Sequence, residues 1–214
     1  MDSLTEKVKE TLSLNSSSKV SLPSSLTQHT VDHAPTNNAS SWKEALSSNT
    51  TSAPASYTLT KTLVFKPKSA KGQTAVLIVV VALEDTATNA AQIAKAAGEK
   101  EARFATPEVV KETLDVSVEE GNSTSSLNCA IFHLYTDLVV SPLAISKDNA
   151  SKVQVLVDSR LASSTELLAF HPSDSSKTIF ITAEQLKSYL ESTAVKVTDV
   201  EFGIAAAGGY TIPI

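Results

Sequence analysis

One lysine occupies the middle of a segment whose side chains alternate between apolar and polar positions. Over residues 57–66, a repeat of two places Tyr57, Leu59, Lys61, Leu63 and Phe65 on one face of a predicted β-strand. Because an ammonium is costly to bury without a partner, such a lysine is expected in one of three settings. It lies at a strand end, pairs with a carboxylate, or faces a cavity that receives an anionic or carbonyl group.

The remaining pattern predicts an α+β fold. Residues 74–83 are apolar on both faces, which is typical of a central strand, and further strand patterns occupy 153–158, 177–181 and 195–202. Helical spacing with capping residues occurs over 88–97, 106–114 and 182–190. We expect a mixed, strongly curved sheet surrounded by helices.

The chain of 214 residues is long enough for one substantial domain with appended segments. We predict an N-terminal extension over 1–56, a folded domain over 57–202, and a linker or the start of a further region over 203–214. The extension is expected to hold a short helix over 2–14, Ser/Thr-rich loops, a short strand within 26–34 and a helix over 41–45 that docks Trp42.

Charge and composition exclude several classes of function. A net charge of -5 argues against holding nucleic acid by bulk electrostatics, so any RNA contact has to be local. Cys129 is the single cysteine, which excludes a disulfide framework and fits a reducing, cytoplasmic compartment. The apolar run over 75–83 is about half the length of a membrane-spanning helix.

Motifs for metal, nucleophilic or nucleotide chemistry are missing. His29 and His33 are four residues apart, but the segment has no helical periodicity and no glutamate partner, so we predict no metal site. No nucleophile elbow or phosphate-binding loop occurs, and no cofactor is expected. The remaining candidates are Lys61 and the stretches 138–145 and 167–172.

The order and spacing of these motifs resemble the YbaK/prolyl-tRNA editing domain family. The resemblance covers about residues 57–192 and rests mainly on three motifs: Lys61-Thr62-Leu63, Arg103-Phe104-Ala105-Thr106-Pro107-Glu108, and Phe170-His171-Pro172. It implies a curved, barrel-like sheet surrounded by helices. It also implies hydrolysis of a mischarged aminoacyl ester, most often alanine on tRNA(Pro), because a pocket for proline cannot fully exclude a smaller side chain.

The resemblance assigns site residues as well. It gives Lys61 the catalytic position, where the ammonium would hold the terminal adenosine's phosphate or the ester region. The family's G-x-x-x-P loop corresponds to the residues from Leu138 to Pro142. Leu138 stands where the family has glycine, which would narrow or reshape the pocket or place the motif in another register. Ser141, Pro142, Leu143, Ala144 and His171 are the remaining substrate-binding residues that the resemblance implies.

The implied context is the N-terminal cis-editing domain of a fungal-type prolyl-tRNA synthetase. Its partners would be the acceptor end of tRNA(Pro) and the remainder of the synthetase chain, with no DNA and no membrane. Two alternatives stay open: a free-standing trans-editing deacylase, and a non-catalytic module that binds tRNA ends or synthetases. The leucine at position 138 favours the binding module.

Overall fold

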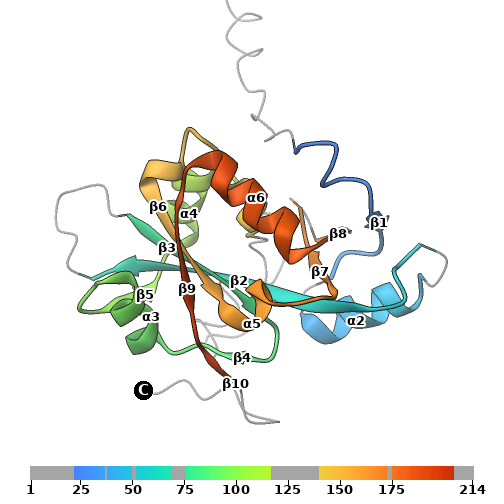
Figure 1. The fold of residues 1–214 in the computed structure, drawn as a ribbon, viewed down its shortest axis with the longest axis horizontal. Helices are drawn as coiled ribbons and strands as arrows, with labels where there is room; N and C mark the ends of the chain where they lie inside the picture. The colour runs from blue at the N-terminus through green and yellow to red at the C-terminus, as the bar shows by residue number, and fades with distance from the viewer. Residues whose placement is uncertain are drawn as a thin grey trace, which may run out of the picture.

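The computed structural model describes residues 22–36, 38–49, 52–68, 76–116, 140–172 and 175–204 (Figure 1). The predicted helix over 2–14, Cys129 and Leu138 lie outside these ranges. The elements in chain order are β1 (Thr30–Asp32), α2 (Ala39–Ser47), β2 (Tyr57–Pro67), β3 (Leu77–Leu83), β4 (Thr86–Ala87), α3 (Ala90–Ala97), β5 (Ala102–Phe104), α4 (Pro107–Leu114), η2 (Pro142–Ala144), η3 (Ala150–Lys152), β6 (Val153–Asp158), α5 (Ser159–Ala162), β7 (Leu167–Phe170), β8 (Lys177–Ile181), α6 (Ala183–Thr193), β9 (Lys196–Val200) and β10 (Gly203–Ile204).

The architecture is a large mixed sheet with helices around it, which confirms the predicted α+β class. The strand order is β1-β8-β7-β2-β3-β6-β9, with β5 also paired to β2 and a separate pair formed by β10 and β4. Strands β3, β6 and β9 run parallel, whereas β2 is antiparallel to β3. Parallel neighbours need a crossover, and α5 with α6 supplies it between β6 and β9.

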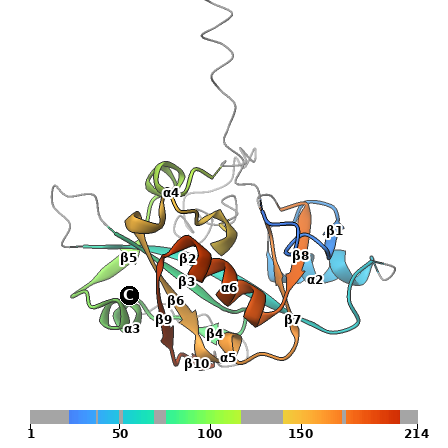
Figure 2. The same ribbon diagram turned by 45° about the horizontal axis from the view of Figure 1, so that its top comes forward.

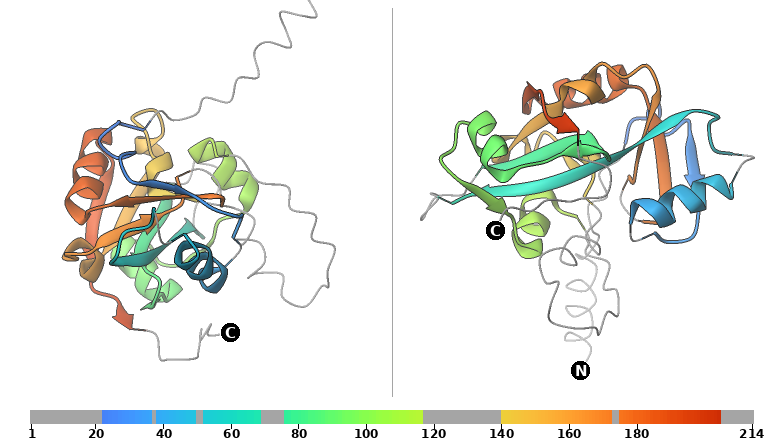
Figure 3. Two further views of the ribbon diagram at one scale, coloured as in Figure 1. Left: turned by 90° about the vertical axis from the view of Figure 1, so that its right-hand side faces the viewer. Right: turned by 90° about the horizontal axis from the view of Figure 1, so that it is seen from below.

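Strand β2 links the two ends of the molecule. Its first residues pair in parallel with β7, up to the pair Leu59 and Ala169, and the pairing with β3 begins at the next residue, Thr60. Figure 3 (right) shows α2 beside one end of this strand and α3 beside the other. Lys61 therefore lies close to the point where β2 changes partners.

The two faces of the central strands contribute to different cores. In β3, Leu77, Val79 and Val81 join a large cluster that includes Leu186 and Leu190 of α6. The alternate residues, Ile78, Val80 and Ala82, join a second cluster that includes Ile93 of α3. Helices α6 and α3 thus cover opposite faces of the sheet (Figure 2). This arrangement explains why 74–83 looks apolar on both faces.

Part of the predicted N-terminal extension packs onto the sheet. Strand β1 pairs antiparallel with β8, and α2 begins at Asn38, whose side chain forms a capping box with Ser41. Trp42 is 6% exposed and packs with Val31, Leu46 and Phe180, as predicted. At the other end, Gly203 and Ile204, the first residues of the predicted linker, pair with Ala87 and Thr86.

Candidate functional site

Lys61 lies on the predicted face of β2, between two hydrophobic clusters. Tyr57 and Leu59 pack against the cluster of α2, whereas Leu63 and Phe65 belong to the α3 side of the sheet. Directly across the antiparallel pair, Lys61 faces Ala82 of β3. Because alanine is short, the long lysine side chain can extend over it toward the end of β3.

The Lys61 ammonium is held by backbone carbonyls of the turn that follows β3. Its Nζ donates to the oxygen of Glu84 at 3.0 Å and to the oxygen of Thr86 at 2.6 Å. Burial lowers the pKa of Lys61 below its ordinary value, and the positive charge of Arg160 acts in the same direction. The carboxylates of Glu84, Asp85 and Asp158 oppose this shift. Lys61 is thus a partly desolvated cation in an acidic setting.

A polar network surrounds this ammonium, and we call Lys61, Asp85, Thr86, Asp158 and Arg160 the Lys61 cluster. The Arg160 guanidinium donates to the two carboxylate oxygens of Asp85 at 2.9 and 3.3 Å, and to the hydroxyl of Thr86 at 2.7 Å. The Thr86 hydroxyl donates in turn to Asp158, which is fully buried. Arg160 also forms an ion pair with Asp158 at 3.6 Å.

The fold explains why these residues meet. Strands β3 and β6 are parallel neighbours, so the turn after β3 and the start of α5 lie at the same edge of the sheet. Asp158 ends β6 and caps α5, because its side chain accepts a hydrogen bond from the backbone N–H of Arg160. The carboxyl ends of parallel strands are a frequent place for ligand sites in α/β sheets.

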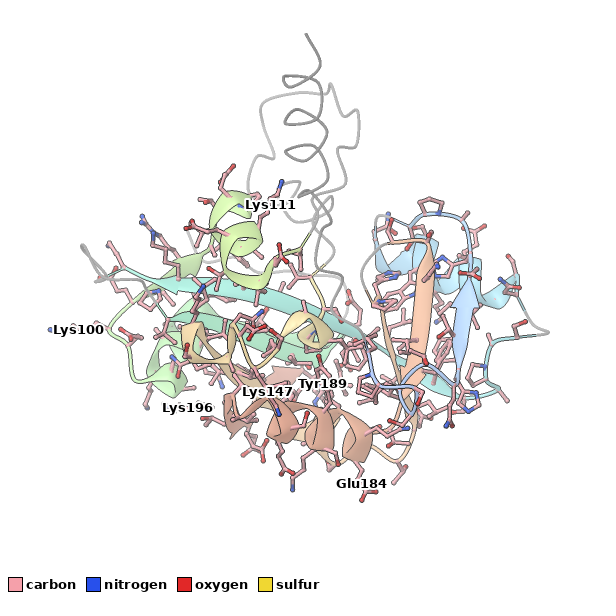
Figure 4. All side chains as sticks on the ribbon, turned by 90° about the horizontal axis from the view of Figure 1, so that it is seen from above. Lys100, Lys111, Lys147, Glu184, Tyr189 and Lys196 are labelled. Carbon is pink, nitrogen blue, oxygen red and sulfur yellow. The ribbon has the colours of Figure 1, made fainter. Side chains whose placement is uncertain are left out.

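The predicted loop contains the short 3₁₀ helix η2, formed by Pro142, Leu143 and Ala144, and Ser141 is its N-cap. All four residues are buried. Leu143 and Ala144 belong to the large cluster on the α6 side of the sheet, not to the clusters beside Lys61. The hydroxyl of Tyr189 lies 2.7 Å from the oxygen of Leu143 and 2.8 Å from that of Ile145. Figure 4 shows Tyr189 on the inner side of α6, with Glu184 at the exposed start of the helix. Burial raises the pKa of Tyr189 to about 12.

His171 directly follows β7 and stacks on Trp42, with ring centroids 4.1 Å apart. Its Nδ1 lies 2.8 Å from the carbonyl oxygen of Lys177, so this nitrogen carries the proton and donates. The pairs between β2 and β7 end at Leu59 and Ala169, and Lys61 and His171 each lie two residues further along. The alternation of strand side chains therefore puts Lys61 and His171 on the same face of neighbouring strands.

The structure brings the predicted residues into two groups. Lys61 and His171 share one face of the sheet, whereas Leu143 and Ala144 belong to the large core on the other face, with Ser141 and Pro142 buried directly before them in the chain. Leu138 lies outside the described residues. A cavity of about 350 Å³ lies between α6 and the segment containing Pro23 and Leu26, and Lys61 does not line it.

Sequence reasoning missed four members of the Lys61 cluster: Asp85, Thr86, Asp158 and Arg160. Only one of them carried a usable signal, since Asp158 directly follows the apolar run Val155-Leu156-Val157 at the end of a strand. The contact between Lys61 and the turn at Glu84 depends on the pairing of β2 with β3. The contact between this turn and α5 depends on the parallel pairing of β3 with β6. In the described ranges, no group of three metal-ligating side chains occurs.

A cation fixed at a sheet edge can bind a phosphate or the carbonyl oxygen of an ester. Its lowered pKa also makes the neutral amine, a proton acceptor, accessible at a lower pH than for an exposed lysine. The Lys61 cluster therefore has the chemistry of an electrostatic or proton-transfer site.

A sequence model of the aminoacyl-tRNA editing domain matches residues 36–137. Over these residues, the chain is a member of the YbaK-type family of aminoacyl-tRNA editing domains. The matched residues begin at position 36, within the segment predicted as an N-terminal extension, and they include α2 and Lys61.

Two yeast relatives carry the name "Putative proline--tRNA ligase". The protein from Schizosaccharomyces pombe is 39% identical over 183 residues, which are 86% of this chain and 22% of that protein. The protein from Saccharomyces cerevisiae is 40% identical over 80 residues, which are 34% of this chain and 12% of that protein. This chain therefore spans about a fifth or less of the length of these relatives.

Two solved structures share the fold at low sequence identity. A hypothetical protein has a TM-score of 0.52 and 18% identity, with 90% of this chain and 97% of that chain covered. A protein described as "a putative trans-editing enzyme for prolyl tRNA synthetase" has a TM-score of 0.51 and 15% identity, with 81% and 86% covered. Among the described residues, no helix has the length and apolar character needed to cross a membrane.

Proposed function

We propose that this chain hydrolyses the ester bond of mischarged tRNA, with Ala-tRNA(Pro) as substrate, as the cis-editing domain of a proline-tRNA ligase. The observation that carries the proposal is the placement of Lys61, a partly buried ammonium at the edge of an editing-domain sheet. The relatives named as proline-tRNA ligases support the choice of tRNA(Pro) and of a longer synthetase chain as context. The acceptor end of tRNA(Pro) and the remainder of that chain are the proposed partners.

Lys61 provides positive charge where the ester would react. An ammonium fixed by two carbonyls does not have to reorganise when negative charge develops on the ester oxygen, so it stabilises the transition state more than the ground state. His171 lies on the same sheet face and is held by Trp42 and by the carbonyl of Lys177. We assign His171 to the amino-acid side of the site, as a residue that binds.

Deacylation of labelled Ala-tRNA(Pro) and Pro-tRNA(Pro) tests the proposal. The wild-type chain should release alanine and leave proline attached, and Lys61→Met should lower the rate by about 100-fold or more, the loss typical of a preorganised electrostatic group. Lys187→Met on the exposed side of α6 is the matched control and should keep the wild-type rate. An unchanged rate in Lys61→Met would remove the assigned role.

A non-catalytic module that binds tRNA ends is the second candidate. Leu138 favours it, since a leucine stands where the editing family has a glycine in the substrate loop. A free-standing trans-editing enzyme would share the same chemistry. Tight binding of uncharged tRNA(Pro) without hydrolysis of Ala-tRNA(Pro) by the wild-type chain would support the binding module over both deacylases.

A further inference from the structure

The turn that holds Lys61 is itself held from other elements, and Arg160 of α5 makes three of the side-chain hydrogen bonds to it. The acceptors of the ammonium are main-chain oxygens of Glu84 and Thr86, so the position of the amine depends on the position of this turn. The backbone N–H of Glu84 still donates to the oxygen of Leu59 in β2, and Thr86 pairs with Ile204 of the short strand β10. Side chains from β6 and α5 hold the end of the turn, at Asp85 and Thr86.

Arg160 provides the α5 part of this restraint. Its planar guanidinium makes two hydrogen bonds to the side chain of Asp85 and one to the side chain of Thr86. Arg160 therefore binds two consecutive residues of the turn. The Nε of Arg160 is buried without a hydrogen-bond partner among the described residues. A buried donor without an acceptor is costly, so the contacts to the turn outweigh that cost.

We propose that Arg160 is a positioning residue, which fixes the turn from Glu84 to Thr86 and thereby sets the place and the charge state of the Lys61 ammonium. This inference rests on the proposed function for its catalytic consequence. Its structural part, the link from Arg160 through the turn to Lys61, stands on the contacts alone.

The electrostatics of the site give this role a signature that a simple loss of structure would lack. Four charged groups act on Lys61: Glu84, Asp85 and Asp158 favour the ammonium, and Arg160 disfavours it. Removing the charge of Arg160 should therefore raise the pKa of Lys61. Removing the charge of Asp85 should lower it, although either change breaks the same pair of hydrogen bonds.

The test uses three variants of the whole chain: Arg160→Gln, Arg160→Lys and Asp85→Asn. For hydrolysis of Ala-tRNA(Pro), Arg160→Gln and Arg160→Lys should each lower kcat by about 10-fold or more with KM changed by less than about threefold, because the ammonium is misplaced rather than lost. Lysine keeps the charge but lacks the planar fork, so Arg160→Lys should leave the Lys61 titration near that of the wild type.

The titration is followed by NMR of lysine labelled with ¹³C at Cε, and the Lys61 signal is the one missing from Lys61→Met. We expect the midpoint to move up in Arg160→Gln and down in Asp85→Asn. Movement in the same direction in both variants, or a kcat in Arg160→Gln within about twofold of the wild type, would overturn the proposal.

The two readouts separate the failure of this inference from that of the proposed function. If the wild-type chain does not hydrolyse Ala-tRNA(Pro), the proposed function fails while the opposite shifts of the Lys61 signal still support the positioning role. Thermal unfolding of each variant verifies the fold. Should Arg160→Gln not fold, the comparison of Arg160→Lys with Asp85→Asn keeps the test decisive, because a low kcat with an unmoved Lys61 midpoint is expected only in the former.

Discussion

Two regions of this domain use a side chain to hold a pair of backbone carbonyls. In the Lys61 cluster, an ammonium contacts the oxygens of Glu84 and Thr86. On the other face of the sheet, the hydroxyl of Tyr189 contacts the oxygens of Leu143 and Ile145. The geometry is similar, but the donor is charged in one region and neutral in the other.

The difference shows what a charge requires of its surroundings. The neutral Tyr189 hydroxyl lies in an apolar core, where hydrogen bonds to carbonyls satisfy it. The Lys61 ammonium is accompanied by three carboxylates and Arg160 and remains partly exposed. A buried charged donor thus costs more desolvation free energy than a neutral donor. A neutral hydroxyl would be sufficient at a site whose only role was to hold a turn.

The largest effect on stability is expected from Asp158→Asn. This change removes a buried carboxylate that accepts from Thr86, pairs with Arg160 and caps α5, so the free energy of unfolding should fall by about 3 kcal/mol in urea titrations. Asp199→Asn on the exposed side of β9 should change it by less than about 0.5 kcal/mol. Equal effects of the two variants would show that the cluster does not depend on its buried charge.

Tyr189→Phe should lower the free energy of unfolding by about 2 kcal/mol, because the two buried carbonyl oxygens share the single hydroxyl proton of Tyr189 and lose it. Tyr57→Phe is the matched control, since the Tyr57 ring packs edge-on against Phe180 without relying on its hydroxyl. A loss in Tyr189→Phe as small as in Tyr57→Phe would mean that the neutral contact contributes little.

The two regions should respond to pH with opposite sign. The pKa of Tyr189 is raised to about 12, so its contribution to stability is complete below about pH 10 and is lost as the pH rises toward 12. The pKa of Lys61 is lowered, so the unfolded chain binds more protons just below pH 10.5 and stability rises with pH there. The free energy of unfolding should be measured from pH 8 to 12. In Lys61→Met its rise with pH below 10.5 should disappear, and in Tyr189→Phe its fall between about pH 10 and 12 should be weaker.

The smallest effect is expected at a charge pair without burial. Lys68 and Glu101 form an ion pair at 2.5 Å, with 62% of each side chain exposed. Lys68→Met should change the free energy of unfolding by less than about 1 kcal/mol, and less still in 1 M salt. A larger change that does not depend on salt would show that an exposed ion pair can contribute as much as a buried one. It would contradict the view that burial sets the energetic weight of the charges in the Lys61 cluster.

Local patterns were sufficient to predict much of the fold. The capping residues are confirmed: Thr106 precedes α4, Gly98 ends α3 with φ of 79°, and Thr182 forms a capping box with Gln185. The strand over 153–158, predicted from an apolar run bounded by polar residues, is also confirmed. Such features depend on neighbours within about four residues, which a sequence displays directly.

The partners of Lys61 could not be predicted in the same way. Lys61 itself was identified because it interrupts an apolar face, but Asp85 and Arg160 are exposed or partly exposed polar residues in short segments. Their importance follows from strand pairings between residues more than 20 positions apart. The placement of Leu143 and Ala144 on the other face of the sheet likewise depends on a cluster that includes Leu186 and Leu190 of α6, which no local pattern encodes.

The change of partners along β2 has a consequence for the placement of Lys61. Leu59 is the last residue in register with β7 and Thr60 the first in register with β3, so a continuous backbone joins the α2 end of the molecule to the α3 end. Lys61 sits one residue beyond that junction. The backbone position of Lys61 is therefore fixed by two sets of strand pairs at once, one with β7 and one with β3.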